Sequence, residues 1–219
     1  MKKIGVVLSG CGAQDGSEIH EAVITLLALD RPGVDTKIMA PDMDQFQVIN
    51  HFSGKTMDTK RNIFIESSRI ARGDIVPINT IRGKDIDAMI FPGGTGMAKN
   101  IFDYHMAGPD FKIVPDVERI TTELLMLRKP IGAICIAPLM VAKILQNMGR
   151  NGTVTVGSNK KFKKDVEIMG INTEQVGAED IVLDDVNKII STPAYVEANS
   201  IGQVSEGITK LVDKILELV

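Results

Sequence analysis

Several residue types are scarce in this chain of 219 residues, and each shortage argues against a class of function. Tryptophan is absent and aromatic residues make up 4% of the chain, so stacking platforms for nucleobases or sugars are not expected. Lysine and arginine number 25 against 28 acidic residues, a formal net charge of −3 that offers no attraction to nucleic acid or an anionic membrane. No apolar run approaches the length of a membrane span. We therefore expect neither nucleic acid nor a membrane as a partner.

Cysteine and histidine are also scarce, with two cysteines, Cys11 and Cys135, and three scattered histidines. Two thiols in a chain of this length do not form a disulfide framework, and the histidines do not show the spacing of a zinc site. The apolar run at 4–8 is too short for a signal peptide, and a glycine-rich turn follows it at once. We therefore expect a reduced, cytoplasmic protein without a metal or a cofactor.

Short apolar runs alternate with segments of helical spacing along the whole chain. Strands are expected at 4–8, 36–40, 46–50, 87–91, 131–134 and 153–157, with a late pair at 180–183 and 188–192. Helices are expected from Ser17, as N-cap, to Pro32, then at 61–71, from about 95, at 117–127, 137–148, 160–169 and 195–218, with a loop at 103–115. Because several strands lack polar alternation, they indicate a mostly parallel, doubly wound α/β sheet with helices on both faces. Ligands of such sheets bind at the carboxyl ends of the strands.

The segment 131–138, Ile-Gly-Ala-Ile-Cys-Ile-Ala-Pro, runs from an expected strand directly into an expected helix, with Cys135 at the junction. Small residues two positions before and after it, Ala133 and Ala137, are typical of a nucleophile elbow, and Pro138 suits a first helical turn. The free N–H groups of a helix start favour thiolate over thiol, so the pattern predicts a lowered pKa and a reactive Cys135. The alternative is a buried core thiol, the commoner fate of a lone cysteine.

A thiolate that attacks a carbonyl needs donors for the oxyanion and a group that moves protons. The glycine-rich turn at 92–96 can bring backbone N–H groups close to a ligand, although it also fits an ordinary strand-to-helix turn. Glu21 or Glu18 can move protons, although the default for both is a solvated first helical turn. Cys11, in the glycine-rich loop at 10–16, either lines the same pocket or, as we favour, only fills the loop.

Taken together, these motifs resemble a known family. The Pro92-Gly93-Gly94 turn, the Cys135 turn and an early helix with glutamates are similar to the PfpI-like branch of the class I glutamine amidotransferase-like superfamily, which includes intracellular proteases, chaperones and cofactor-free glyoxalases. More narrowly, the segments 8–12, 15–21, 48–51, 98–100 and 192–195 resemble the ElbB family of isoprenoid-biosynthesis, or enhancing-lycopene-biosynthesis, proteins with glyoxalase-type activity. The resemblance covers essentially the whole chain and implies one flavodoxin-like domain over 1–219 that forms a homodimer.

The resemblance also implies roles for particular residues. Cys135 matches the nucleophile, and Glu21 matches the carboxylate, because the spacing that follows it fits related glyoxalases; Glu18 is the alternative. The backbone N–H groups of Gly94 and Ile136 become the oxyanion donors. The chain departs from the protease and amidotransferase branches at Ile136, because no histidine stands next to the cysteine.

The histidines offer little to replace that partner. His105 lies in the expected loop near the active edge and is favoured as a surface residue, while His20 is expected to pack or cap locally. His51 lies in an irregular region and has no spacing that suggests a metal ligand.

Three functions follow from these patterns. The first is a cofactor-independent glyoxalase that takes small aldehydes such as methylglyoxal through a Cys135 hemithioacetal. The second is a non-catalytic chaperone, redox sensor or regulator of isoprenoid metabolism, with Cys135 as the peroxide target. The third is a nucleotide-binding domain, although the glycine spacing at 10–16 is one residue longer than the dinucleotide fingerprint.

Overall fold

The computed structural model describes residues 1–219 and contains a seven-stranded sheet in the order β10-β11-β7-β6-β1-β2-β5. All neighbouring pairs are parallel except β10 and β11, which form the late antiparallel pair predicted from the sequence. The strands of this sheet are β1 Lys2–Val7, β2 Val34–Ala40, β5 Val76–Pro77, β6 Ala88–Phe91, β7 Ile131–Ile134, β10 Val182–Asp184 and β11 Ile189–Thr192.

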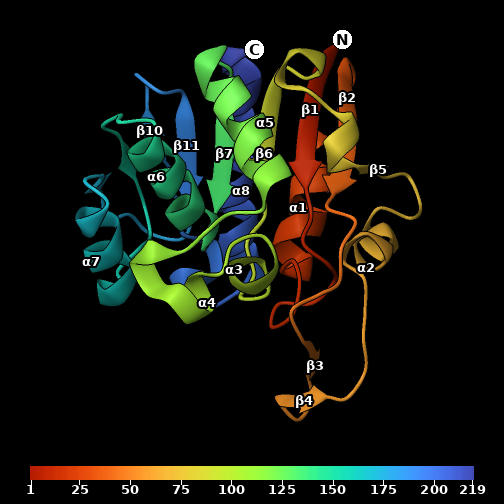
Figure 1. Cartoon of the computed structure of the whole chain (residues 1–219). Coiled ribbons are helices and arrows are strands. Elements are labelled where there is room, and N and C mark those ends of the chain that lie inside the picture. Colours follow the sequence, from red (N-terminus) through yellow and green to blue (C-terminus); the bar gives the residue numbers. More distant parts are fainter.

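Helices cover both faces of this sheet (Figure 1). One face packs on α1 and α8, and the other packs on α3, α5 and α6. The helices are α1 Ile19–Leu29, α2 Ile63–Ile70, α3 Met97–Asn100, α4 Tyr104–Ala107, α5 Pro115–Met126, α6 Ala137–Asn147, α7 Lys160–Ile168 and α8 Ile201–Leu218. This arrangement confirms the doubly wound, flavodoxin-like fold predicted from the sequence.

The missing polar alternation of the strands follows from this two-sided burial. In β6, Ala88 and Ile90 belong to the core under α1 and α8, whereas Met89 and Phe91 belong to the core under α5 and α6. All four side chains are fully buried. Alternate residues of a strand face opposite sides of a sheet, so a strand with a core on each side must be apolar throughout.

Two small sheets lie outside the main one. The hairpin of β3 Val48–Asn50 and β4 Lys55–Met57 projects away from the body below the carboxyl ends of the strands (Figure 1). The second pair consists of β8 Thr153–Val154 and β9 Asn172–Thr173. The strand expected at 153–157 therefore ends early, at Val154. Its partner strand β9 was not predicted from the sequence.

Two further expectations are corrected by local geometry. The last helix begins at Ile201, with Ser200 as a cap that accepts a hydrogen bond from the Gln203 N–H, and not at Tyr195. A 3₁₀ turn, Ala194–Val196, stands at the expected start. The loop expected at 103–115 contains the short helix α4, whose Tyr104 packs in the core.

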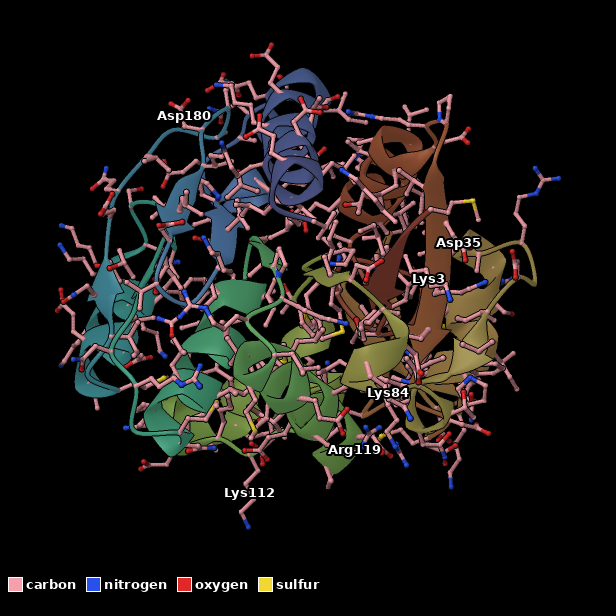
Figure 2. The ribbon with its side chains drawn as sticks, turned by 90° about the horizontal axis from the view of Figure 1, so that it is seen from above. Lys3, Asp35, Lys84, Lys112, Arg119 and Asp180 are labelled. Carbon is pink, nitrogen blue, oxygen red and sulfur yellow. The ribbon has the colours of Figure 1, made fainter.

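Charged side chains lie at the periphery of the molecule. Seen from above, Lys112 lies at the lower margin of the molecule and Asp180 at its upper left margin (Figure 2). No helix combines the length and the apolar character needed to cross a membrane.

Candidate active site

The peptide chain turns sharply at Cys135, directly after β7. Cys135 has a positive φ of 62°, and Ile136 caps the start of α6. A left-handed conformation of a non-glycine residue costs on the order of 1–3 kcal/mol and persists only where its surroundings enforce it. Here the Cys135 N–H donates to the carbonyl of Thr192 over 2.9 Å, which ties the turn to the end of β11. The thiol is thus held at the carboxyl edge of the sheet, as in a nucleophile elbow.

Two backbone N–H groups face the thiol of Cys135. They belong to Gly94 and Ile136, and both lower the pKa of the thiol through hydrogen bonding. Gly94 has a φ of 109°, and a Cβ there would lie 2.5 Å from the backbone nitrogen of Glu18. Only glycine fits this position, so the turn at 92–96 is shaped for the site.

Glu21 and Cys135 lie on the same side of Gly93, where a side chain at that position would point. Its carboxyl is fully buried and accepts hydrogen bonds from the Gly93 N–H at 2.9 Å and the Tyr195 N–H at 3.4 Å. A Cβ on Gly93 would lie 2.6 Å from the Cβ of Cys135 and 2.8 Å from Oε2 of Glu21. The absence of a side chain at Gly93 therefore lets the thiol and the carboxyl meet.

Burial sets the charge state of this pair. It raises the pKa of Glu21 to about 8, with a further contribution from the negative charge of Glu18, while hydrogen bonds from Gly93, Tyr195 and Cys135 oppose the rise. Burial and the charge of Glu21 also raise the pKa of the Cys135 thiol well above its usual range. The resting thiol is therefore protonated and needs a base before it can attack.

The pKa of Cys135 corrects the sequence prediction of a lowered value. The helix-start donor invoked there is present, since the Ile136 N–H lowers the pKa together with that of Gly94. Burial and the neighbouring Glu21 outweigh both donors, because desolvation disfavours the charged form of any group. The raised pKa of Glu21 has the same main cause, because burial disfavours its charged form as well.

Glu18 plays a capping role. Its carboxylate accepts a hydrogen bond from the Glu21 N–H over 2.7 Å, which makes Glu18, and not Ser17, the N-cap of α1. The Ser17 hydroxyl instead accepts the Ser9 N–H inside the protein. Of the two candidate carboxylates, the structure brings Glu21 to the thiol and leaves Glu18 on the wall of the adjoining cavity.

A cavity of about 510 Å³ opens in front of the thiol. This volume suits a small molecule. Its walls come from the loop after β1, the start of α1, the turn after β6, the start of α6, the start of α7 and the turn after β11: Ala13, Glu18, His20, Gly94, Thr95, Cys135, Ile136, Asn159, Phe162, Tyr195 and Val196.

Four polar residues of this wall were not predicted as site residues: His20, Thr95, Asn159 and Tyr195. His20 Nδ1 and the Tyr195 hydroxyl lie 2.7 Å apart and both line the cavity. His20 therefore does more than the local packing expected of it. The signal for Tyr195 was available, because it follows the predicted strand at 188–192 at the same edge of the sheet as Cys135. His105 is exposed and outside the cavity, as expected.

Several backbone N–H groups of the glycine-rich loop at 10–16 are hydrogen-bonded within the protein. The N–H groups of Gly12, Gly16 and Ser17 donate to carbonyls within the loop, and the Gly10 N–H donates to the Ser67 hydroxyl. A Cβ on Gly96 would lie 1.8 Å from the Gly16 nitrogen. The glycines thus let protein backbones pack together, and these N–H groups are not free to cradle a phosphate. Cys11 fills this loop and does not line the cavity.

The side chains that could bind a metal ion are dispersed in the structure. No three side chains of His, Cys, Asp or Glu converge as a metal site would require. His51, the histidine near Asp15, accepts a hydrogen bond from the Gln14 N–H at 3.2 Å.

Curated relatives align over nearly the whole chain. The ES1 protein homolog of rat, a mitochondrial protein, is 37% identical over 99% of this chain and 84% of its own length. The human glutamine amidotransferase-like class 1 domain-containing protein 3, also mitochondrial, is 38% identical over 99% of this chain and 83% of its own length. The cytoplasmic location predicted from the sequence is contradicted by these mitochondrial relatives. No protein-family model matches the chain.

Solved structures repeat the fold. An isoprenoid biosynthesis protein with an amidotransferase-like domain from Ehrlichia chaffeensis superposes with a TM-score of 0.92 at 36% identity, covering 100% of this chain and 99% of the other. A ThiJ/PfpI domain protein from Brachyspira murdochii has a TM-score of 0.60 at 15% identity, covering 99% and 98% of the two chains. The second likeness concerns the fold alone.

Proposed function

Because the chain belongs to the ES1 family of class I glutamine amidotransferase-like proteins, we propose that it is a cofactor-independent glyoxalase. It would convert small 2-oxoaldehydes such as methylglyoxal and glyoxal to 2-hydroxy acids. The proposal is supported by a thiol and a buried carboxyl that are in contact beside a small cavity. The observation that carries the proposal is the contact of Glu21 with Cys135 beside Gly93, because one carboxyl there can serve both the sulfur and a carbon bonded to it.

The first step is addition of the sulfur to the aldehyde carbon, C1. The ionised form of Glu21 accepts the thiol proton as the new C–S bond forms, and then gives this proton to the former aldehyde oxygen. The N–H groups of Gly94 and Ile136 stand beside the sulfur and can donate to that oxygen while it is negative. The product is a hemithioacetal on Cys135.

The second step moves hydrogen between adjacent carbons. Glu21 removes the proton from C1 and returns it to C2, while the C1 oxygen loses its hydroxyl proton and the C2 oxygen gains one, which converts the hemithioacetal to a thioester of the 2-hydroxy acid. Carbon 1 is oxidised and C2 is reduced by the same electron pair, so the step needs no external oxidant. Water then cleaves the thioester, releases the acid and restores the thiol.

The same geometry weighs against a redox sensor. Peroxide reacts with thiolate, and burial together with the charge of Glu21 raises the pKa of Cys135 and keeps the thiol protonated. The proposed reaction uses Glu21 twice, as the base for the thiol and as the carrier of the carbon-bound proton, whereas a sensor has no use for the second role. Protease chemistry lacks support as well, because Ile136 stands where a histidine would be needed.

The homodimer implied by the resemblance remains part of the proposal. The outer face of α1 carries a stripe of exposed apolar side chains, Ile19, Val23 and Leu27, at successive helical turns. Exposed apolar stripes of this kind are typical of association surfaces.

The decisive experiment is methylglyoxal turnover without glutathione, with lactate measured as product. We expect Cys135→Ala to lower turnover by about 10³-fold or more, because it removes the covalent step. The matched control is Cys11→Ala, which removes the other thiol outside the cavity and should stay within about twofold of the unmodified protein. Equal turnover by the Cys135→Ala variant would remove this residue from the mechanism.

A further inference from the structure

Tyr195, in the turn after β11, contacts the Glu21 carboxyl and also lines the cavity. Tyr195 donates its N–H to Glu21, while its hydroxyl lies 2.7 Å from Nδ1 of His20. Ala194, immediately before it, has a positive φ of 43°. A backbone strained in this way costs free energy and is kept only where the surroundings enforce it. This conformation places Tyr195 on the cavity wall that also includes Cys135, with its N–H on the buried Glu21.

The proposed reaction leaves one oxygen without a partner. When C1 loses its proton, negative charge develops on the ketone oxygen at C2. The Gly94 and Ile136 N–H groups stand at the sulfur, where the aldehyde oxygen forms, and Glu21 is occupied with the carbon-bound proton. An enediol intermediate of this kind requires an acid near C2.

Few groups on the wall can supply that acid. Glu18 is engaged as the cap of α1, and the Asn159 side-chain oxygen accepts from the Lys161 and Phe162 N–H groups at the start of α7. The Thr95 hydroxyl and the Asn159 amide can donate hydrogen bonds but are far too weak as acids to give up a proton. Tyr195 has a phenol, and its partner His20 is exposed to solvent, from which protons can be exchanged.

We propose that Tyr195 is a further catalytic residue, the acid that protonates the ketone oxygen at C2, and that His20 is the positioning residue that holds its hydroxyl. This inference rests on the proposed glyoxalase function. It also implies a substrate rule: turnover requires a second carbonyl next to the aldehyde, and simple aldehydes add to Cys135 without reacting further.

The protons balance over the cycle. Glu21 takes the C1 proton, the C1–H electron pair forms the C1–C2 double bond, and the ketone oxygen takes the Tyr195 proton to give an enediol. Glu21 then protonates C2, and the C1 hydroxyl returns its proton to the Tyr195 oxygen as the thioester carbonyl forms. With its proton on Nδ1, His20 donates to the phenol oxygen and stabilises the transient tyrosinate. In the resting site, burial and the charges of Glu18 and Glu21 raise the pKa of Tyr195 and keep the acid loaded.

The test is Tyr195→Phe, which removes only the hydroxyl. We expect kcat for methylglyoxal to fall about 10²-fold, a common cost of removing one acid or donor, with little change in KM. The rate at which iodoacetamide alkylates Cys135, followed on its own peptide by mass spectrometry, should stay within about twofold of the unmodified protein. A parallel loss of alkylation would show a general disturbance of the site and overturn the assignment of an acid.

Two variants of His20 test its positioning role. Asparagine keeps a hydrogen-bonding group near the place of Nδ1, so His20→Asn should retain more kcat than His20→Leu. Equal activity of His20→Leu and the unmodified protein would overturn the role of His20. An unmodified protein that consumes no methylglyoxal overturns the glyoxalase proposal itself, whereas an active protein with an equally active Tyr195→Phe variant overturns the present inference alone.

Discussion

The two cysteines occupy comparable places in the fold but differ in their surroundings. Cys11 follows β1 and Cys135 follows β7, so both lie at the carboxyl edge of the same parallel sheet. Both thiols are partly buried, and burial raises the pKa of each. Each also has a glutamate nearby, Glu66 for Cys11 and Glu21 for Cys135.

The difference lies in the surroundings of the glutamate. Glu66 is held by two arginines, with Arg69 at 2.9 Å and Arg61 at 3.4 Å, so its charge is balanced by permanent cations. Glu21 is fully buried, and its hydrogen-bond donors are backbone N–H groups and the thiol. A buried carboxyl that lacks a cation can exchange protons near neutral pH, as the raised pKa of Glu21 indicates. The comparison indicates that the carboxyl, more than the thiol, distinguishes a reactive turn from a structural one.

The largest expected effect separates these two glutamates. Glu21→Gln should lower methylglyoxal turnover by about 10²–10⁴-fold, because it removes the base. Glu66→Gln should stay within about twofold, because it lies outside the cavity. Steady-state kinetics of both variants measure the contrast, and a comparable loss in both would erase the distinction between the turns.

The pH dependence sharpens the same contrast. Since the pKa of Glu21 is raised to about 8 and the proposed reaction starts from its ionised form, kcat/KM of the unmodified protein should rise with pH and level off above about 8. A profile that is flat between about pH 6 and 9 would contradict Glu21 as the base.

Stability should show the proton on Glu21 directly. Its pKa is about 8 in the folded protein and about 4.3 in an unfolded chain. The folded state therefore binds more protons between these values, and raising the pH across this window destabilises it. Relative to Glu21→Gln, the free energy of unfolding of the unmodified protein should fall by roughly 3 kcal/mol between about pH 5 and 8.

Denaturant titrations at several pH values measure this change. Cys11→Ala is the matched control: burial raises the pKa of the Cys11 thiol, so it stays protonated over the whole window and its replacement should add no slope. A Glu21→Gln curve parallel to that of the unmodified protein would mean that the carboxyl is ionised when folded.

The smallest expected effect concerns the backbone of the two turns. At Cys135, with its positive φ, glycine should be more stable than alanine by about 1 kcal/mol, because a Cβ is disfavoured there. At Cys11, which has no positive φ, glycine should be less stable than alanine by about 0.5–1 kcal/mol, because glycine loses more chain entropy. Thermal unfolding of the four variants gives the two signs, and the same sign at both positions would remove the backbone difference.

Much of the fold was open to prediction because its signals are local. Apolar runs such as that of β6 and the turn residues that follow them indicate a covered parallel sheet without knowledge of any contact. Cys135 could be placed at a strand-to-helix junction for the same reason. The choice of Ser17 as N-cap was wrong, because the Ser17 side chain is taken up by the Ser9 N–H from another part of the chain.

The sequence by itself determined the doubly wound sheet and the sharp turn at Cys135 with its small flanking residues, Ala133 and Ala137, since these depend on neighbours along the chain. The tertiary structure alone decided that Glu21 and not Glu18 meets the thiol, that His20 meets Tyr195, and that the pKa of Cys135 is raised and not lowered. The physical reason is that desolvation and charge interactions depend on distances between segments far apart in sequence, which only packing of the sheet and its helices fixes.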